Sequence, residues 1–196
     1  HKQERRGMTE IHSFAEIDAS LRSIDTGEPA TAKRRLFASA ARFQNRAVKP
    51  REWLVEGFIP NGTVTLLGGD GGSGKSLLAM MLAIATASTK DVRWLGRLPV
   101  QGPAIYCGAE DDIDEMHRRM ADITDANFIQ FTDLERLHVC SLAGQDALLA
   151  VENPKTKVLA ATPLFAEIRD KIEAARPSLV VFDTLADLFG ANENDR

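Results

Sequence analysis

In the last two thirds of the chain, apolar residues occur in two patterns that alternate along the sequence. Short continuous apolar runs with strand-like composition occur at 63–67, 104–107, 137–140 and 178–183. Between and after them, apolar residues recur at helical intervals over 77–87, 113–123 and 164–172. Strands that alternate with helices predict an α/β fold, a three-layer arrangement in which helices cover both faces of a parallel sheet.

Several details sharpen this prediction. In the 178–183 run, residues 179–182 are all apolar and Asp183 ends the run, which is typical of a central parallel strand covered on both faces. The 77–87 helix is apolar on most sides, so we expect it to be buried against the sheet, with its methionines as core filler. Asp111 or Asp112 is the expected N-cap of the next helix, and Thr162-Pro163 begins the last one. Residues 141–161 show less regularity, and we expect a surface loop there.

The first 50 residues have a different composition from the rest of the chain. They are polar and alanine-rich, and residues 8–50 are expected to be helical in pieces, with residues 1–50 acting as a partly disordered helical and linker segment. Basic residues dominate from 33 to 51: they are Lys33, Arg34, Arg35, Arg42, Arg46, Lys49 and Arg51. Two interpretations remain open, a contact with nucleic acid or a neighbouring subunit, and a solvated helix and linker.

Composition excludes several classes of protein. The net charge of −4 over 196 residues gives no overall nucleic-acid signature, although a local basic groove remains compatible with it. Cys107 and Cys140 lie in apolar runs and are expected to be reduced core thiols, and His138 is interpreted as an ordinary strand residue. No apolar run approaches the ~18 residues of a membrane span, so we expect a cytoplasmic protein.

A glycine-rich loop lies between the 63–67 run and the 77–87 helix. From Gly69 it has the spacing G-x-x-x-x-G-K-S, and strand, loop and helix follow in the order of a phosphate-binding loop. Such loops aim backbone N–H groups at phosphate oxygens, while the lysine reaches the β- and γ-phosphates and the hydroxyl holds Mg²⁺. The predicted nucleotide-binding residues are Gly69, Asp70, Gly71, Gly72, Ser73, Gly74, Lys75, Ser76 and Leu77.

Two acidic residues follow strands and suggest the rest of the site. Asp183 ends an apolar strand and is the expected second Mg²⁺-site residue beside Ser76. Many ATPases place a glutamate directly after that aspartate, but here Thr184 follows, so another strand must supply the base. Glu110, at the carboxyl end of the 104–107 run, is the best candidate to orient the attacking water, although the acids there could also form only a helix cap.

Two arginines near the acidic strand end are further candidate site residues. Arg118 and Arg119 follow Glu110 on the predicted helix. Either could approach the phosphates or a neighbouring subunit, and a solvated helix face is an equally open alternative.

Trp53 is a candidate of another kind, since it could lie beside the nucleotide base or serve packing alone.

These motifs together resemble those of a known family. Beside the phosphate loop they comprise the element from Tyr106 to Asp112, the His117-Arg118-Arg119 group, and the stretch from Val180 to Phe189, followed by Asn192 to Arg196. The chain resembles the RecA-like ATPases of the RepA replicative-helicase type, AAA-family proteins, over roughly 51–196.

The resemblance implies a RecA-like P-loop ATPase domain over 51–196, incomplete at its C-terminal end. It implies ATP and Mg²⁺ as ligands, a hexameric ring with ATP between subunits, and movement along single-stranded DNA. Lys75 and Ser76 would bind the nucleotide and Mg²⁺, Glu110 would be the base, Asp183 the metal-site acid, and Arg119 a catalytic cation. A recombinase-like or regulatory ATPase, and a nucleotide-binding assembly module with little turnover, remain alternatives.

Overall fold

The computed structural model describes residues 37–153 and 158–188, and its main feature is a parallel sheet. The sheet has three strands in the order β4-β3-β7, namely Leu137–Ser141, Ala104–Gly108 and Leu179–Asp183. In the middle of the sheet, Tyr106 is paired with Val139 on one side and Val181 on the other. Because the strands are parallel, their carboxyl ends meet at one edge, where ligands bind in folds of this kind.

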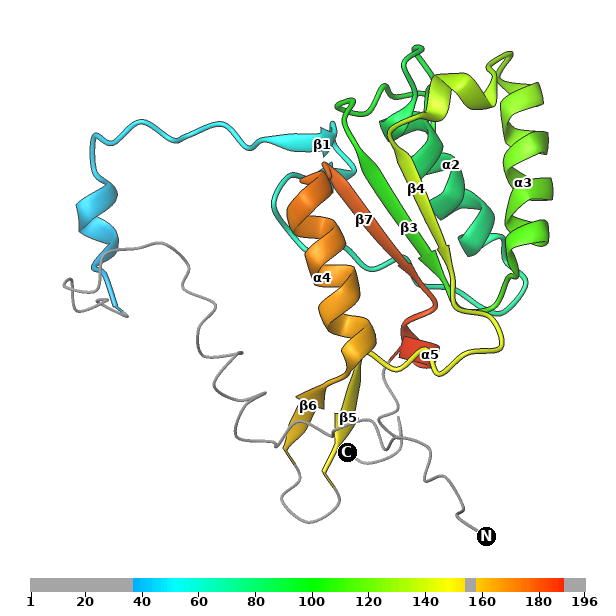
Figure 1. Cartoon of the computed structure of the whole chain (residues 1–196). Helices are drawn as coiled ribbons and strands as arrows, with labels where there is room; N and C mark the ends of the chain where they lie inside the picture. The colour runs from blue at the N-terminus through cyan, green and yellow to red at the C-terminus, as the bar shows by residue number, and fades with distance from the viewer. Residues whose placement is uncertain (1–36, 154–157, 189–196) are drawn as a thin grey trace, which may run out of the picture.

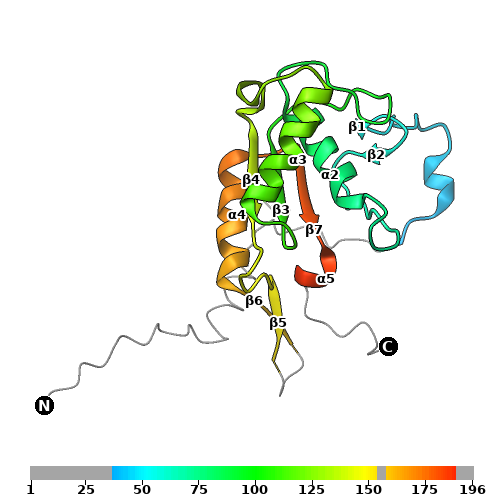
Figure 2. The same cartoon turned by 90° about the vertical axis from the view of Figure 1, so that its right-hand side faces the viewer.

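Helices cover both faces of this sheet. Helices α2 (Lys75–Ala87) and α3 (Ile113–Ala126) lie on one face, and α4 (Pro163–Ala175) lies on the other (Figures 1 and 2). The predicted three-layer α/β fold with a parallel sheet is therefore confirmed.

Side-chain alternation along β3 divides the core in two. Ala104 and Tyr106 pack with α2 and α3, whereas Ile105 and Cys107 belong to a second cluster on the side of α4. Cys107 is buried, Cys140 is half-buried, and both thiols are free. Burial raises the pKa of Cys107 to about 12, so this thiol stays protonated.

Local capping chemistry sets where the helices begin. Asp112, rather than Asp111, is the N-cap of α3, and its Oδ1 accepts a hydrogen bond from the Glu115 N–H at 2.7 Å. Thr162 caps α4 ahead of Pro163, as the sequence predicted. Its hydroxyl accepts from the Phe165 N–H at 3.3 Å and donates to the Leu148 carbonyl at 2.7 Å.

Replacing Thr162 by alanine should lower the free energy of unfolding by about 1–2 kcal/mol, since the helix loses its cap and the half-buried Leu148 carbonyl loses its donor. Thermal unfolding followed by circular dichroism measures the effect. Thr162→Ser keeps the hydroxyl and should retain most of the stability. Equal stability of the alanine variant and the wild type would contradict the capping role.

The apolar run 63–67 does not form the predicted strand. A strand requires backbone pairing with a neighbour, and no ladder includes these residues; Val64 is 93% exposed and Leu66 76%. The preceding apolar residues pair instead in a small antiparallel hairpin of β1 (Trp53–Val55) and β2 (Ile59–Pro60). Strand propensity alone therefore gave a wrong prediction for 63–67.

Two further predictions differ from the structure. Within 141–161, β5 (Ala150–Glu152) and β6 (Leu159–Ala161) form an antiparallel pair where a loop was expected. The runs are too short for a strand pattern to stand out in the sequence. Strand β7 was expected at the centre of the sheet, but within the described residues it is an edge strand, and its residues are half-buried or exposed.

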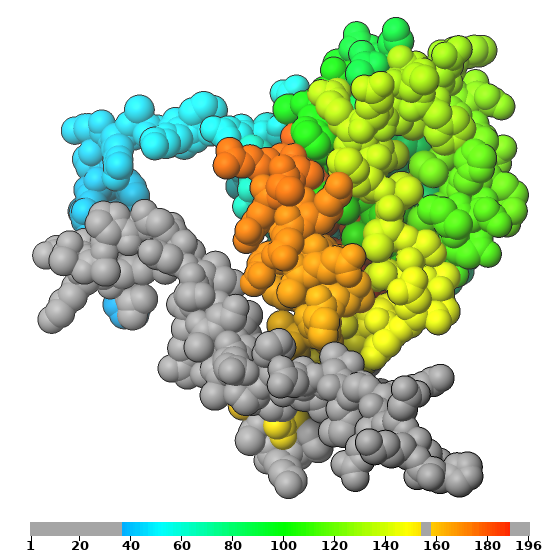
Figure 3. All heavy atoms as spheres, in the orientation of Figure 1, coloured from blue at the N-terminus to red at the C-terminus, as the bar shows by residue number. Residues whose placement is uncertain are grey.

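The described part of the N-terminal segment runs outside the three layers (Figures 1 and 3). All residues from 37 to 50 are exposed, and the 3₁₀ turn η1 (Ala40–Phe43) is their regular structure. The predicted helical positions Phe14, Ile17, Leu21 and Ile24 lie outside the described residues. Trp53 in β1 lies 5.5 Å from the Arg51 guanidinium, measured to the ring centre.

Short elements complete the described chain. These are the 3₁₀ turn η2 (Phe131–Leu134) before β4 and the short helix α5 (Leu185–Leu188) after β7.

None of the helices in the described ranges has the length and apolar character needed to cross a membrane.

Candidate functional site

The glycine-rich loop turns directly into the N-terminus of α2. Gly74 is the N-cap of the helix with φ of 84°, and Gly72 has φ of 72°. These left-handed conformations are strained for any residue with a Cβ, so glycine at both positions lets the loop curl tightly. The first N–H groups of α2 have no acceptor within the helix, and together with the helix dipole they favour an anion at this end.

Lys75 is the first residue of α2, and its side chain folds back over the loop. Its Nζ donates hydrogen bonds to the carbonyls of Gly69 at 2.8 Å and Asp70 at 2.7 Å. The Ser73 N–H closes a turn onto the Asp70 carbonyl at 3.3 Å. The ammonium group is thus held at the loop on a flexible stem, within reach of an anion bound there.

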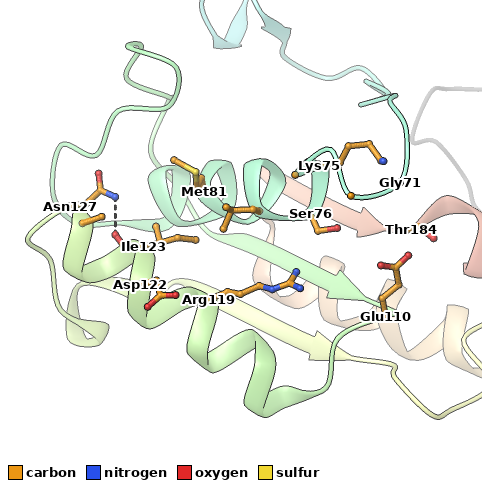
Figure 4. A pocket seen from close by; sticks show the side chains of 14 residues that line it. Gly71, Lys75, Ser76, Met81, Glu110, Arg119, Asp122, Ile123, Asn127 and Thr184 are labelled. Atoms are coloured by element: carbon orange, nitrogen blue, oxygen red, sulfur yellow. Dashed lines mark hydrogen bonds between the residues drawn. The ribbon is translucent and has the colours of Figure 1, made fainter.

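A pocket of about 690 Å³ opens from the loop into the groove between α2 and α3. This volume lies within the ~300–1,000 Å³ range of ligand pockets. Figure 4 shows the side chains of Ser76, Glu110 and Arg119 reaching into it from different elements. The predicted site residues that line it are Gly71, Gly72, Gly74, Lys75, Ser76, Leu77, Glu110 and Arg119.

The remaining predicted residues do not line this pocket. Gly69 and Asp70 lie at the start of the loop, where their carbonyls accept hydrogen bonds from the Lys75 amino group. Ser73 lies between Gly72 and Gly74 but is not part of the lining. Asp183 ends β7 just outside the lining, while its neighbour Thr184 contributes to the pocket wall. The Thr184 hydroxyl donates a short hydrogen bond to Asp187.

The loop that carries Glu110 is held from both sides by neighbouring strand ends. The Ala109 N–H donates to the Asp183 carbonyl at 2.7 Å, and the Ser141 hydroxyl donates to the Asp111 carbonyl at 2.8 Å. These bonds fix the backbone around Glu110, whose own side chain is exposed. An exposed carboxylate on a fixed backbone suits a group that must accept a proton from water.

Arg119 reaches the pocket as part of an ion-pair cluster. It contacts Asp111 at 2.5 Å and Glu115 at 3.0 Å, and Arg118 also pairs with Glu115, at 2.8 Å. Partial burial raises the pKa of Asp111, although the Arg119 guanidinium opposes this shift. Arg119 is thus the arginine that lines the pocket, whereas Arg118 lies on the exposed face of α3.

Asp183 has a partner that the sequence did not predict. The buried Tyr106 hydroxyl donates a hydrogen bond to its Oδ2 at 2.7 Å. Burial, reinforced by the hydrogen bond to Asp183, raises the pKa of Tyr106 well above its usual range, so the phenol remains a donor. The apolar character of the 104–107 run concealed this polar contact.

The side-chain oxygens that could serve as metal ligands fit a Mg²⁺ ion bound together with a nucleotide better than a metal centre made of protein ligands alone. No group of three or more His, Cys, Asp or Glu side chains within residues 37–153 and 158–188 could hold a metal ion. Ser76 lines the pocket and Asp183 lies just outside its lining. One hydroxyl and one carboxylate are the kind of sparse oxygen set that Mg²⁺ accepts when phosphates and water supply the other ligands.

Sequence reasoning missed the part of the pocket that lies away from the glycine-rich loop. The side of the groove away from the loop is lined by Met81, Asp122, Ile123, Ala126 and Asn127. Met81, expected as core filler, does pack against the core, and its half-buried side chain also lines the pocket. The helical spacing of these residues was visible in the sequence, whereas the packing of α2 beside α3 was not.

Comparison with known families agrees with this geometry. A family model described as an AAA domain matches residues 28–196, which include the glycine-rich loop, Glu110 and Asp183. The match supports a nucleotide-binding domain of the ATPase type. Since it spans most of the sequence, the chain belongs to the AAA domain family.

Proposed function

We propose that this chain is the ATP-binding and ATP-hydrolysing RecA-like motor domain of a RepA-type hexameric replicative DNA helicase. The observation that carries the ATPase part is the convergence of Lys75, Ser76 and Glu110 on one pocket at the carboxyl edge of a parallel sheet. The helicase part draws on the motifs around Glu110 and Asp183, which resemble those of that family.

In this proposal the loop and α2 bind the triphosphate. Lys75 turns from the loop carbonyls to the β- and γ-phosphates, and the free N–H groups at the start of α2 donate to phosphate oxygens. Ser76 and Asp183 hold Mg²⁺, which when bound neutralises charge on the phosphates. The nearby Gly71, Gly72 and Gly74 leave room for the phosphates to approach the backbone.

Hydrolysis then depends on Glu110 and on cations around the γ-phosphate. Glu110 orients the attacking water and accepts its proton, while Lys75 stabilises the charge that develops on the phosphate oxygens. Arg119 adds a second positive group, and its pairs with Asp111 and Glu115 fix the direction of its guanidinium. All these groups act from one chain, and further cations would come from a neighbouring subunit of the ring.

Single-stranded DNA and neighbouring subunits are the proposed macromolecular partners. The described N-terminal residues 37–50 are exposed throughout and carry Arg42, Arg46 and Lys49. Such a basic, exposed segment can contact phosphates or an acidic surface of the next subunit.

ATPase assays with and without single-stranded DNA, together with a strand-separation assay on a forked duplex, test the proposal in the full-length protein. We expect DNA to stimulate ATP turnover and ATP to drive strand separation. Filaments on DNA that promote strand exchange would instead favour a recombinase-like ATPase. ATP binding without turnover, with or without DNA, would contradict the motor function and favour an assembly module.

A further inference from the structure

The hydroxyl of Tyr106 contacts the carboxylate that ends the neighbouring strand. We propose that Tyr106 is a positioning residue that orients the Asp183 carboxylate for Mg²⁺ bound with the nucleotide. This inference rests on the proposed function, since it assigns a role within the same site. It is carried by three observations: the position of Tyr106 in the sheet, the space over Gly108, and the hydrogen bonds of Asp183.

The sheet register brings the two residues to the same face. Tyr106 of β3 lies opposite Val181 of β7, and Asp183 is two residues further along, opposite Gly108. Residues two apart on a strand point to the same side, so Asp183 shares the face on which Tyr106 and Val181 pack with α2. The tyrosine side chain spans these two residues, about 6.6 Å, by leaning toward the carboxyl end of the sheet.

The lack of a side chain at Gly108 leaves space in which the aromatic ring of Tyr106 can extend toward Asp183. A Cβ at this position would lie 3.2 Å from Cε1 of Tyr106 and 2.6 Å from the terminal methyl of Met116. The ring therefore passes close over the glycine, in space that another residue would fill. The absence of a side chain at the last residue of β3 is thus directly linked to the reach of the Tyr106 hydroxyl.

The hydrogen bonds of Asp183 hold the residue at two points. The Tyr106 hydroxyl occupies Oδ2, and the Ala109 N–H binds the main-chain carbonyl, each at 2.7 Å. A carboxylate with one oxygen engaged in this way presents the other in a defined direction. Partners that orient a metal-binding group in this manner typically change metal affinity by ~10–100-fold when they are removed.

The competing explanation is that Tyr106 only fills the core. Tyr106 is 1% exposed and belongs to the cluster under α2 and α3, so its ring certainly contributes packing. Phenylalanine would fill the same space without the hydroxyl. Tyr106→Phe therefore separates the two roles, because a packing role predicts no change that depends specifically on Mg²⁺.

The test compares binding of a fluorescent ATP analogue with Mg²⁺ and with EDTA, in wild type and in Tyr106→Phe. We expect equal affinity in EDTA and a loss of about tenfold in the affinity gain that Mg²⁺ provides, the lower end of the range for such partners. Electron paramagnetic resonance of Mn²⁺, titrated in the presence of ATP, should show the same weakening. An unchanged Mg²⁺-dependent gain, or an equal loss with and without Mg²⁺, would overturn the proposal.

Two further variants make the result specific. Val181→Ala removes packing on the same face and should lower thermal stability without altering the Mg²⁺-dependent gain. Gly108→Ala keeps the hydroxyl but crowds the ring, and it should reduce the gain by a smaller factor than Tyr106→Phe. If Val181→Ala reduced the gain as much as Tyr106→Phe, packing alone would explain the effect. If the wild type failed to bind the analogue at all, the proposed function itself would fail.

Discussion

Replacing Lys75 by alanine should weaken ATP binding by at least about 30-fold, because losing one partner of a close charged contact costs about 2 kcal/mol or more. The Lys75 ammonium group lies over the glycine-rich loop, where its hydrogen bonds go to two main-chain carbonyls. In the ATP complex these bonds are exchanged for stronger bonds to charged phosphate oxygens. Equilibrium binding of a fluorescent ATP analogue measures the loss.

Lys90→Ala is the matched control for this variant. Lys90 lies beyond the far end of α2, and its exposed side chain pairs with the half-buried Asp133 at 3.8 Å. The control removes the same charge from the chain without touching the pocket, so its ATP affinity should stay within about twofold of wild type. Unchanged ATP affinity in Lys75→Ala would contradict the assignment of this loop to phosphate binding.

Glu110→Gln should preserve ATP binding and lower the rate of hydrolysis by about 100-fold or more, the usual contribution of a general base. Glutamine keeps the size and the hydrogen-bonding shape of the side chain but cannot accept a proton. The loop backbone should not move, because Asp183 and Ser141 hold it from both sides. Single-turnover hydrolysis in the full-length protein, together with ATP affinity, separates chemistry from binding.

Asp114→Asn is the matched control, because it removes one carboxylate charge at the start of α3 without altering the pocket. Asp114 is exposed in the first turn of α3 and does not line the pocket. Its amide variant should hydrolyse ATP at close to the wild-type rate. Normal turnover in Glu110→Gln would mean that another group activates the water.

The parts of the fold that the sequence predicted correctly are those where local chemistry and core packing agree. Helix α2 follows a glycine-rich turn and is apolar on most sides, so its start and its burial could both be anticipated. The cap at Thr162 and the proline after it likewise marked the beginning of α4.

The incorrect predictions concern pairing between distant segments. The 63–67 run has strand composition, yet strand formation requires a ladder partner that composition does not specify. Strand β7 was apolar enough for a central position, but its place at the edge depends on which segments pair beside it. The pairing of β5 with β6 also depends on contacts between two separate runs, each of which is too short to show a period.

For the site, the motifs located the loop and the strand-end acids, but not their supporting contacts. Lys75, Ser76, Glu110 and Arg119 were predicted, and all four line one pocket. The bond from Tyr106 to Asp183 joins residues 77 positions apart, and its existence depends on the register of β3 against β7. A tyrosine two residues before a glycine at a strand end was the one signal in the sequence that could have suggested it.

The central claim is that Lys75, Ser76, Glu110 and Asp183 act on a single bound triphosphate. A crystal structure with Mn²⁺ and a non-hydrolysable ATP analogue tests it most directly, because anomalous scattering locates the metal independently of the model. We predict a manganese peak at about 2.1 Å from the Ser76 hydroxyl oxygen, with Asp183 in the coordination sphere of the metal or one water away from it. The Lys75 amino group should contact the phosphates, and the Glu110 carboxylate should face the γ-phosphate. A manganese position remote from Ser76 and Asp183, or a nucleotide bound away from the glycine-rich loop, would contradict the account.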